Sequence, residues 1–127
     1  MIEHIALPVS NYERSKAFYA AALKPLGYKL NMEFPGGAGF MEGGHTSFLI
    51  EEKKRTEPTH VAFLAKSKEE VQKFYDAALA AGAKDNGAPG FRIDYGPDYY
   101  AAFILDTDSH NIEACYFGEK VTDEKVA

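Results

Sequence analysis

The chain is poor in cysteine and has no long apolar run. Its single cysteine, Cys115, excludes an internal disulfide and a CxxC motif, and one thiol is typical of a reducing compartment. The apolar stretches are far shorter than the roughly 20 residues needed to cross a bilayer, and the N-terminus begins without a basic leader. We therefore expect a soluble, cytoplasmic protein with no membrane partner.

Positive charge is also scarce. The sequence has 14 Lys and Arg residues against 19 Asp and Glu residues, a net charge of −5, and the basic residues are scattered among acidic ones. Binding to nucleic acid depends on a basic surface that displaces counterions, so we do not expect a nucleic-acid partner. The composition, 46% hydrophobic and 26% charged over 127 residues, is typical of one globular domain.

The sequence repeats itself at an offset of 56 residues. Residues 4–7, 18–19 and 21–23 align at this one offset with 60–63, 74–75 and 77–79. The first block is a short apolar run typical of a strand, and the others belong to a helical pattern. Ser10 or Asn11, and Ser67, are suited to begin the two helices, while Gly27 and Gly82 are suited to end them. We therefore predict two modules that each begin with a strand and a helix.

The rest of each module is predicted to be strands. In the first half we expect them at 28–34, near Phe40 and at 45–51. In the second half a Gly- and Pro-rich stretch at 87–97 predicts an inserted loop, followed by strands at 99–105 and 111–117. The expected organisation is a single domain of residues 1–127, with module one at about 1–52, module two at about 58–118 and a tail at 119–127.

Three polar side chains interrupt predicted core strands. Glu113 stands in an apolar run where an unpaired carboxylate costs several kcal/mol to bury. His4 and His60 occupy equivalent positions in the two modules. If a pseudo-twofold axis relates the modules, all three face one trough, and two imidazoles with one carboxylate can hold Fe, Mn, Zn or Ni as a divalent ion. We predict one such ion on His4, His60 and Glu113; a metal-free polar pocket is the alternative.

These residues resemble the glyoxalase/bleomycin resistance protein/dioxygenase group of the vicinal oxygen chelate superfamily. The resemblance rests on His4, the helical segment 11–27, His60 and the segment 106–113, DTDSHNIE, which is similar to the element D-P-D-G-x-x-[IVL]-E of that group. It covers nearly the whole chain. It implies an α+β fold of paired βαβββ modules, which form a half-open curved sheet around a central pocket with the helices packed outside.

The resemblance also implies where metal ligands lie. Metal-dependent members take them from the first and last strands of each module, positions that resemble His4, Phe48 or a neighbour, His60 and Glu113 here. Phe48 and its neighbours are not carboxylates, so the sequence departs from the glyoxalase I pattern, which has a Glu on that strand. The two-His-one-Glu set is more similar to that of extradiol dioxygenases, which are usually built from more modules.

The segment by which the two halves differ carries candidate substrate contacts. Arg92 can hold a carboxylate or phosphate through paired hydrogen bonds, and tyrosines supply stacking faces and hydroxyl protons. We predict Glu113 and Tyr100 as catalytic residues, and Arg92, Tyr95 and Phe48 as substrate-binding residues.

Four further side chains are interpreted as structural. Tyr99 is expected to pack, and Cys115 to be a small buried residue without a catalytic role. His45 and His110 are read as polar residues at matching entries to strands.

Two main hypotheses for function follow. The first is a metal-dependent enzyme that chelates a small molecule through vicinal oxygens, with lyase, isomerase or dioxygenase chemistry. The second is a metal-free protein of the antibiotic-resistance type that sequesters an aromatic or cationic molecule, in keeping with an aromatic content of 13%. A weaker third is a role in dimerisation or scaffolding. Because the superfamily often pairs modules between chains, a homodimer is expected.

Overall fold

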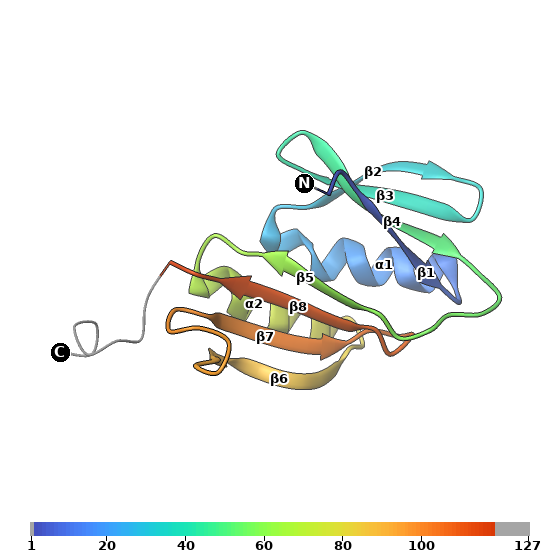
Figure 1. Ribbon diagram of the computed structural model, residues 1–127. Coiled ribbons are helices and arrows are strands. Elements are labelled where there is room, and N and C mark those ends of the chain that lie inside the picture. The colour runs from blue at the N-terminus through green and yellow to red at the C-terminus, as the bar shows by residue number, and fades with distance from the viewer. Residues whose placement is uncertain (1, 119–127) are drawn as a thin grey trace.

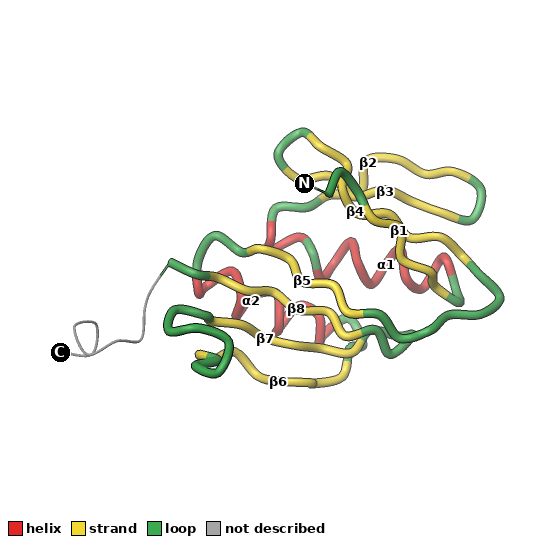
Figure 2. Tube along the Cα trace, viewed as in Figure 1, coloured by secondary structure: helices red, strands yellow, loops and turns green. Residues whose placement is uncertain are grey.

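The chain folds as two copies of one βαβββ module, as Figures 1 and 2 show. The computed structural model describes residues 2–118, so the predicted tail at 119–127 lies outside the described residues. The elements are β1 (Ile5–Val9), α1 (Tyr12–Ala22), the 3-10 helix η1 (Lys24–Leu26), β2 (Lys29–Phe34), β3 (Gly37–Glu42), β4 (His45–Glu52), β5 (His60–Leu64), α2 (Lys68–Ala80), β6 (Lys84–Phe91), β7 (Tyr100–Leu105) and β8 (Asn111–Tyr116). The predicted α+β class and paired modules are confirmed.

Each module forms its own four-stranded mixed sheet. The strand orders are β1-β4-β3-β2 and β5-β8-β7-β6. In both sheets the first strand runs parallel to the last, and the other neighbours are antiparallel. The first strand of each module, β1 or β5, is therefore an edge strand. Within residues 2–118 no ladder joins the two sheets.

The two helices begin at the predicted capping residues. The Asn11 side chain accepts a hydrogen bond from the Arg14 amide at 3.0 Å, and the Ser67 hydroxyl accepts one from the Glu70 amide at 3.1 Å. Each satisfies a backbone donor that the first helical turn leaves without a partner. Gly27 ends η1 at a φ of +88°, a conformation that favours glycine. In the described part of the chain, no helix combines the length and apolar character needed to span a membrane.

The predicted loop at 87–97 is wrong in its first part, because β6 runs through Phe91. Its ladder with β7 is irregular, with register shifts on both sides of Gly87, which has a φ of +147°. Pro89 is tolerated because β6 is the outer edge strand, where a missing amide proton need not cost a ladder hydrogen bond. The inserted turn is therefore confined to residues 92–99.

Aromatic side chains form the contact between the modules. Phe48 of β4 packs against Tyr19 of α1 with ring centroids 5.0 Å apart, and against Phe63 of β5 at 5.1 Å. Tyr28 meets Phe63 edge to face at 5.3 Å. Burying a side chain of this size contributes about 1.5–3 kcal/mol, so these rings hold the two modules together.

A polar contact joins the modules at the turn before β8. The Asp108 carboxylate accepts a hydrogen bond from the Ser10 amide at 3.1 Å, and the Tyr19 hydroxyl donates to Asp106. The ring of His110, which is fully buried, donates from Nε2 to the carbonyl of Pro8 at 2.8 Å. Because all three bonds cross from one module to the other, this turn fixes their relative orientation.

Candidate functional site

The two faces of the second sheet differ in polarity. On one face, fully buried apolar side chains such as Ile112 and Ala114 belong to the core that packs against α2. Side chains alternate along a strand, so Glu113, between them, points to the opposite face. Phe103 of β7 is its cross-strand neighbour there, and His60, which opens β5, contacts its carboxylate. This open face of the second sheet holds the candidate site.

Glu113 is the centre of the site. Its side chain is only 2% exposed, whereas the His60 side chain is 53% exposed. Nε2 of His60 lies 2.7 Å from Oε1 of Glu113, and the Tyr99 hydroxyl donates to Oε2. An ionised carboxylate only accepts hydrogen bonds, so Nε2 of His60 carries the proton of that bond. Both oxygens of the buried carboxylate are thereby satisfied by neighbouring side chains.

Tyr99 is held as a neutral phenol. Burial raises the pKa of Tyr99 well above its ordinary value, and the hydrogen bond to Glu113 and the negative charge of that carboxylate raise it further. Burial likewise raises the pKa of the Cys115 thiol, with Glu113 as the second cause. Cys115 is buried on the same strand, and burial and Glu113 together outweigh the Tyr99 hydrogen bond, which lowers its pKa, so the reactive thiolate is disfavoured.

His4 does not join His60 and Glu113 within one chain. It lies just before β1, exposed, with its Nδ1 against the Glu3 carboxylate. His45 approaches Glu3 too, with Nε2 2.8 Å from the Glu3 carbonyl oxygen. Among residues 2–118 there is no group of three His, Cys, Asp or Glu side chains arranged to hold a metal ion. The fold therefore brings together two of the three predicted metal ligands.

Tyr100 lies on the side of the sheet opposite to Glu113. Its ring packs edge to face on Phe91 at 5.1 Å, and its hydroxyl accepts a hydrogen bond from Gln72 of α2 at 3.0 Å. The neighbouring residue, Tyr99, is the tyrosine that reaches the carboxylate. The structure thus places Tyr100 in the packing against α2 and Tyr99 in the site.

Arg92 and Tyr95 line a cavity on the open face, whose wall also includes Phe103, the cross-strand neighbour of Glu113. The cavity measures about 280 Å³ and is lined by Asn86, Gly87, Arg92, Tyr95, Phe103 and Asn111. Tyr95 also meets the ring of Tyr99 edge to face at 5.4 Å, which links this cavity to the carboxylate. Both predicted substrate contacts therefore lie next to the Glu113 centre.

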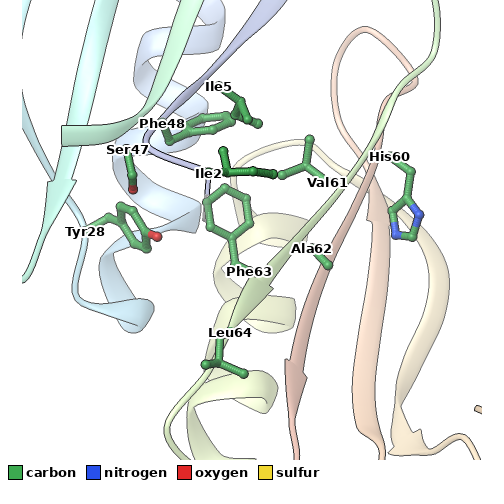
Figure 3. Close-up of a pocket in the computed structure, with 10 residues that line it drawn as sticks. All are labelled: Ile2, Ile5, Tyr28, Ser47, Phe48, His60, Val61, Ala62, Phe63 and Leu64. Atoms are coloured by element: carbon green, nitrogen blue, oxygen red, sulfur yellow. The ribbon is translucent and has the colours of Figure 1, made fainter. Parts of the chain in front are cut away.

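Phe48 lies elsewhere, in the core between the modules. It is 1% exposed and borders a second cavity of about 350 Å³, which has apolar walls including Ile5, Val61 and Phe63. His60 also borders this cavity, and Figure 3 shows its ring on the other side of β5 from Val61 and Phe63. Phe48 thus lies in a core cavity that it shares with His60, whereas Glu113 is not among the residues that line it.

Tyr99 is the site residue that the sequence reasoning missed, although a signal was present. The turn between β7 and β8 pairs Leu105 with Asn111, so Phe103 pairs with Glu113. Counting back in steps of two from Phe103 along the chain reaches Tyr99 and skips Tyr100. The alternation of side chains along the strand therefore predicts that Tyr99, and not Tyr100, shares the face of Glu113. This prediction needs the length of the turn, which sets how the two strands pair.

Comparison with known proteins agrees with this fold. Residues 1–114 match the Glyoxalase/Bleomycin resistance protein/Dioxygenase superfamily. The chain is 27% identical over 122 residues to the uncharacterized protein YqjT of Bacillus subtilis (strain 168), covering 88% of this chain and 95% of that protein.

Solved structures show the same architecture. A glyoxalase/bleomycin resistance protein from Albidiferax ferrireducens T118 is similar with a TM-score of 0.78 and 26% identity, over 90% of this chain and 96% of that chain. A glyoxalase/bleomycin resistance protein/dioxygenase family enzyme from Burkholderia phytofirmans PsJN shares the fold with a TM-score of 0.72 and 18% identity, over 91% of this chain and 98% of that chain. With the match over residues 1–114, the chain belongs to the glyoxalase/bleomycin resistance protein/dioxygenase superfamily.

Proposed function

We propose that this protein is an enzyme acting on a small molecule held against the open face of the second sheet, with Glu113 as the reacting group. The observation that carries the proposal is the setting of Glu113, a carboxylate on a side chain only 2% exposed at the base of a polar face. If Glu113 had a purely structural role, an apolar side chain would usually stabilise the fold as well, because burying a charge is costly. Buried titratable groups beside a cavity are typical of functional sites.

The three hydrogen-bonded side chains can divide the proton chemistry. The Glu113 carboxylate can accept a proton from a substrate carbon or oxygen. Tyr99, with its raised pKa, stays protonated at neutral pH, and once Glu113 has taken up a proton the Tyr99 hydroxyl can turn to donate its hydrogen bond to a developing oxyanion. His60 is half exposed and bonded to Glu113, so it can pass a proton between the carboxylate and solvent. Lyase, isomerase and dioxygenase reactions all use such steps.

A divalent metal ion fits this site only in part. The His60 imidazole and the Glu113 carboxylate are donors of the kind that Fe, Mn, Zn and Ni ions accept, and their nearest atoms are 2.7 Å apart. A bound ion would act as a Lewis acid toward vicinal oxygens of the substrate. The described part of one chain supplies only these two ligands, so a third has to come from elsewhere.

A homodimer offers the missing ligand. His4 precedes the edge strand β1, His60 opens the edge strand β5, and both side chains are about half exposed. A twofold axis that sets β1 of one copy beside β5 of the other would bring His60 and Glu113 close to His4 of the partner subunit. We include this dimer and a cytoplasmic location in the proposal; the free thiol of Cys115 is compatible with the latter.

A metal-free binding protein is the second candidate, and one observation favours it. Tyr99 and His60 already satisfy both oxygens of Glu113, so the buried charge needs no cation to compensate it. The same face could then retain a small molecule without transforming it.

Metal analysis of protein purified without chelators or affinity-tag metals separates the two candidates. We expect about one ion per chain in the wild type, lost in Glu113→Gln, His60→Ala and His4→Ala. His45→Ala is the matched control, because it removes an imidazole of similar exposure, 52%, outside the site. Sedimentation velocity on the same samples reports the dimer.

An ion-free wild type would overturn the metal-dependent proposal. If a small molecule then raised the melting temperature equally in the wild type and in Glu113→Gln, the metal-free candidate would be supported. If the ion were lost in His60→Ala and Glu113→Gln but kept in His4→Ala, the site shared between two subunits would be rejected. The metal-dependent proposal itself would stand.

A further inference from the structure

The guanidinium of Arg92 is held in place without an acidic partner in the described part of the chain. Its Nη2 atom donates to the carbonyl of Ala88 at 2.6 Å, and its central carbon lies 5.4 Å from the centroid of the Phe103 ring. Among residues 2–118, no carboxylate forms an ion pair with it. One of its five N–H groups is accounted for by Ala88, so a planar donor edge remains for a ligand.

Two glycines make room for this arrangement. A Cβ atom on Gly87 would lie 3.1 Å from Nη2 of Arg92 and 3.0 Å from the Phe103 ring, and a Cβ on Gly90 would lie 3.1 Å from Nη1. All three contacts are tighter than a side chain normally accepts, and Gly87 also has a φ of +147°. At Gly87 and Gly90, the irregular edge strand β6 thus presents only backbone atoms to the guanidinium.

The surroundings of Arg92 are polar and lead to the Glu113 centre. The amide of Asn86 donates to the side chain of Asn111 at 3.2 Å, which leaves amide groups of both residues facing the same cavity of about 280 Å³. The guanidinium packs over the Phe103 ring. The centroid of the Phe103 ring lies 6.3 Å from the centroid of the His60 imidazole. The guanidinium and the imidazole thus both lie against the Phe103 ring, on the same face of the second sheet as Glu113.

We propose that Arg92 is the anchor for an oxyanion of the substrate, so that the protein acts on a small organic acid, either a carboxylate or a phosphate ester. A guanidinium recognises both anions through two parallel hydrogen bonds, and the Phe103 face holds its plane. The cavity lies just below the range of roughly 300–1,000 Å³ typical of ligand pockets, which fits a short molecule. This inference rests on the proposed function, because it takes the reacting end of the molecule to lie at Glu113.

Titration of the full-length protein followed by NMR tests the anchor. The probes are inorganic phosphate, acetate and the neutral acetamide. We expect saturable shifts at the Arg92 Nε–H group and at the amides of Gly87 and Phe103 with phosphate, acetate or both, and none with acetamide. Arg92→Gln should weaken binding about tenfold or more, as expected when hydrogen bonds to a charged group are lost. Arg92→Lys, which keeps the charge but not the planar edge, should also bind more weakly than the wild type.

Arg55→Gln is the matched control, since it removes one exposed positive charge from the connection between the modules. Equal weakening in Arg55→Gln and Arg92→Gln would show general charge attraction and overturn the anchor, as would the absence of saturable shifts with both anions. Phosphate alone would indicate a phosphate ester, and acetate alone a carboxylic acid.

The metal content of the same samples separates this inference from the proposed function. We expect Arg92→Gln to keep the wild-type metal content. Anion binding that fails in a metal-loaded wild type rejects the anchor alone. Anion binding that persists in an ion-free protein rejects the metal-dependent function and leaves the anchor as a binding site.

Discussion

At the scale of single residues, the site depends on how one carboxylate is paired. Glu113 is almost fully buried, and its two donors differ: His60 is half exposed, while Tyr99 is partly withdrawn from solvent and is a neutral phenol. A phenol that donates to a carboxylate resists losing its proton, because the product would place two negative charges side by side. The stability of the folded state must therefore depend on pH in the range where tyrosines ionise.

Replacing Tyr99 with Phe tests this dependence. The pKa of Tyr99 is raised in the folded state above the value of about 10 expected in the unfolded chain. Its contribution to stability is therefore complete below about pH 10 and is lost as the pH rises toward the folded pKa. Urea unfolding at several values from about pH 8 to about pH 11 should show a steeper fall in unfolding free energy for the wild type than for Tyr99→Phe. Parallel curves would contradict the assignment, and exposed Tyr95→Phe is the control.

At the scale of elements, the turn between β7 and β8 organises more than its own strands. The Asp106 carboxylate accepts hydrogen bonds from the amides of Asp108 at 2.9 Å and His110 at 2.8 Å. The His110 ring accepts from the Thr59 amide at Nδ1, 3.0 Å away, and donates from Nε2 to the Pro8 carbonyl. This pattern requires a neutral ring with the proton on Nε2. One turn therefore sets the cross-strand register and ties β8 to the first module.

Replacing His110 with Ala should destabilise the protein strongly. The change leaves the Thr59 amide and the Pro8 carbonyl, which take part in partly buried hydrogen bonds, without these partners, and it empties the fully buried site of the ring, so we expect a loss of about 2–4 kcal/mol. Chemical denaturation measures it. His45→Ala, which removes a 52% exposed imidazole at the start of β4, should change stability by less than about 0.5 kcal/mol. A small effect of His110→Ala would show that the turn does not hold the modules together.

The elements also show what the sequence could and could not predict. The repeat was enough to predict two modules that each begin with a strand and a helix, and the family resemblance implied the full βαβββ plan. The polar residues inside apolar strands singled out His60 and Glu113. The strand β6 escaped prediction because Gly87, Pro89 and Gly90 are turn-forming residues by composition, and only an edge position accommodates them. Tyr99 escaped because the face of a strand residue depends on a register that the length of the turn sets.

At the scale of the whole molecule, the repeat predicts equivalent positions but not how the modules are placed. Equivalence makes His4 and His60 counterparts, and the prediction that they converge assumed a particular arrangement within one chain. The contacts of Phe48 with Phe63 and of His110 with Pro8 fix a different arrangement of the modules. In that arrangement His60 contacts Glu113, and His4 is not part of the group. Such contacts are specified by side-chain shape across the two modules, which no local pattern in the sequence records.

Mixing two inactive variants tests whether the site is shared between chains. In the proposed dimer each site takes His4 from one chain and His60 with Glu113 from the other, so neither His4→Ala nor Glu113→Gln alone has an intact site. A mixed dimer of the two variants has one intact site and one doubly altered site. After unfolding and refolding together in equal amounts, half the dimers should be mixed, and metal content should recover to about a quarter of the wild-type value. A site formed within one chain cannot recover on mixing, because every chain lacks a ligand. Variants that are refolded separately and then combined provide the control. If their metal content recovered as much as after joint refolding, the mixed dimers would have formed by exchange of subunits between folded dimers.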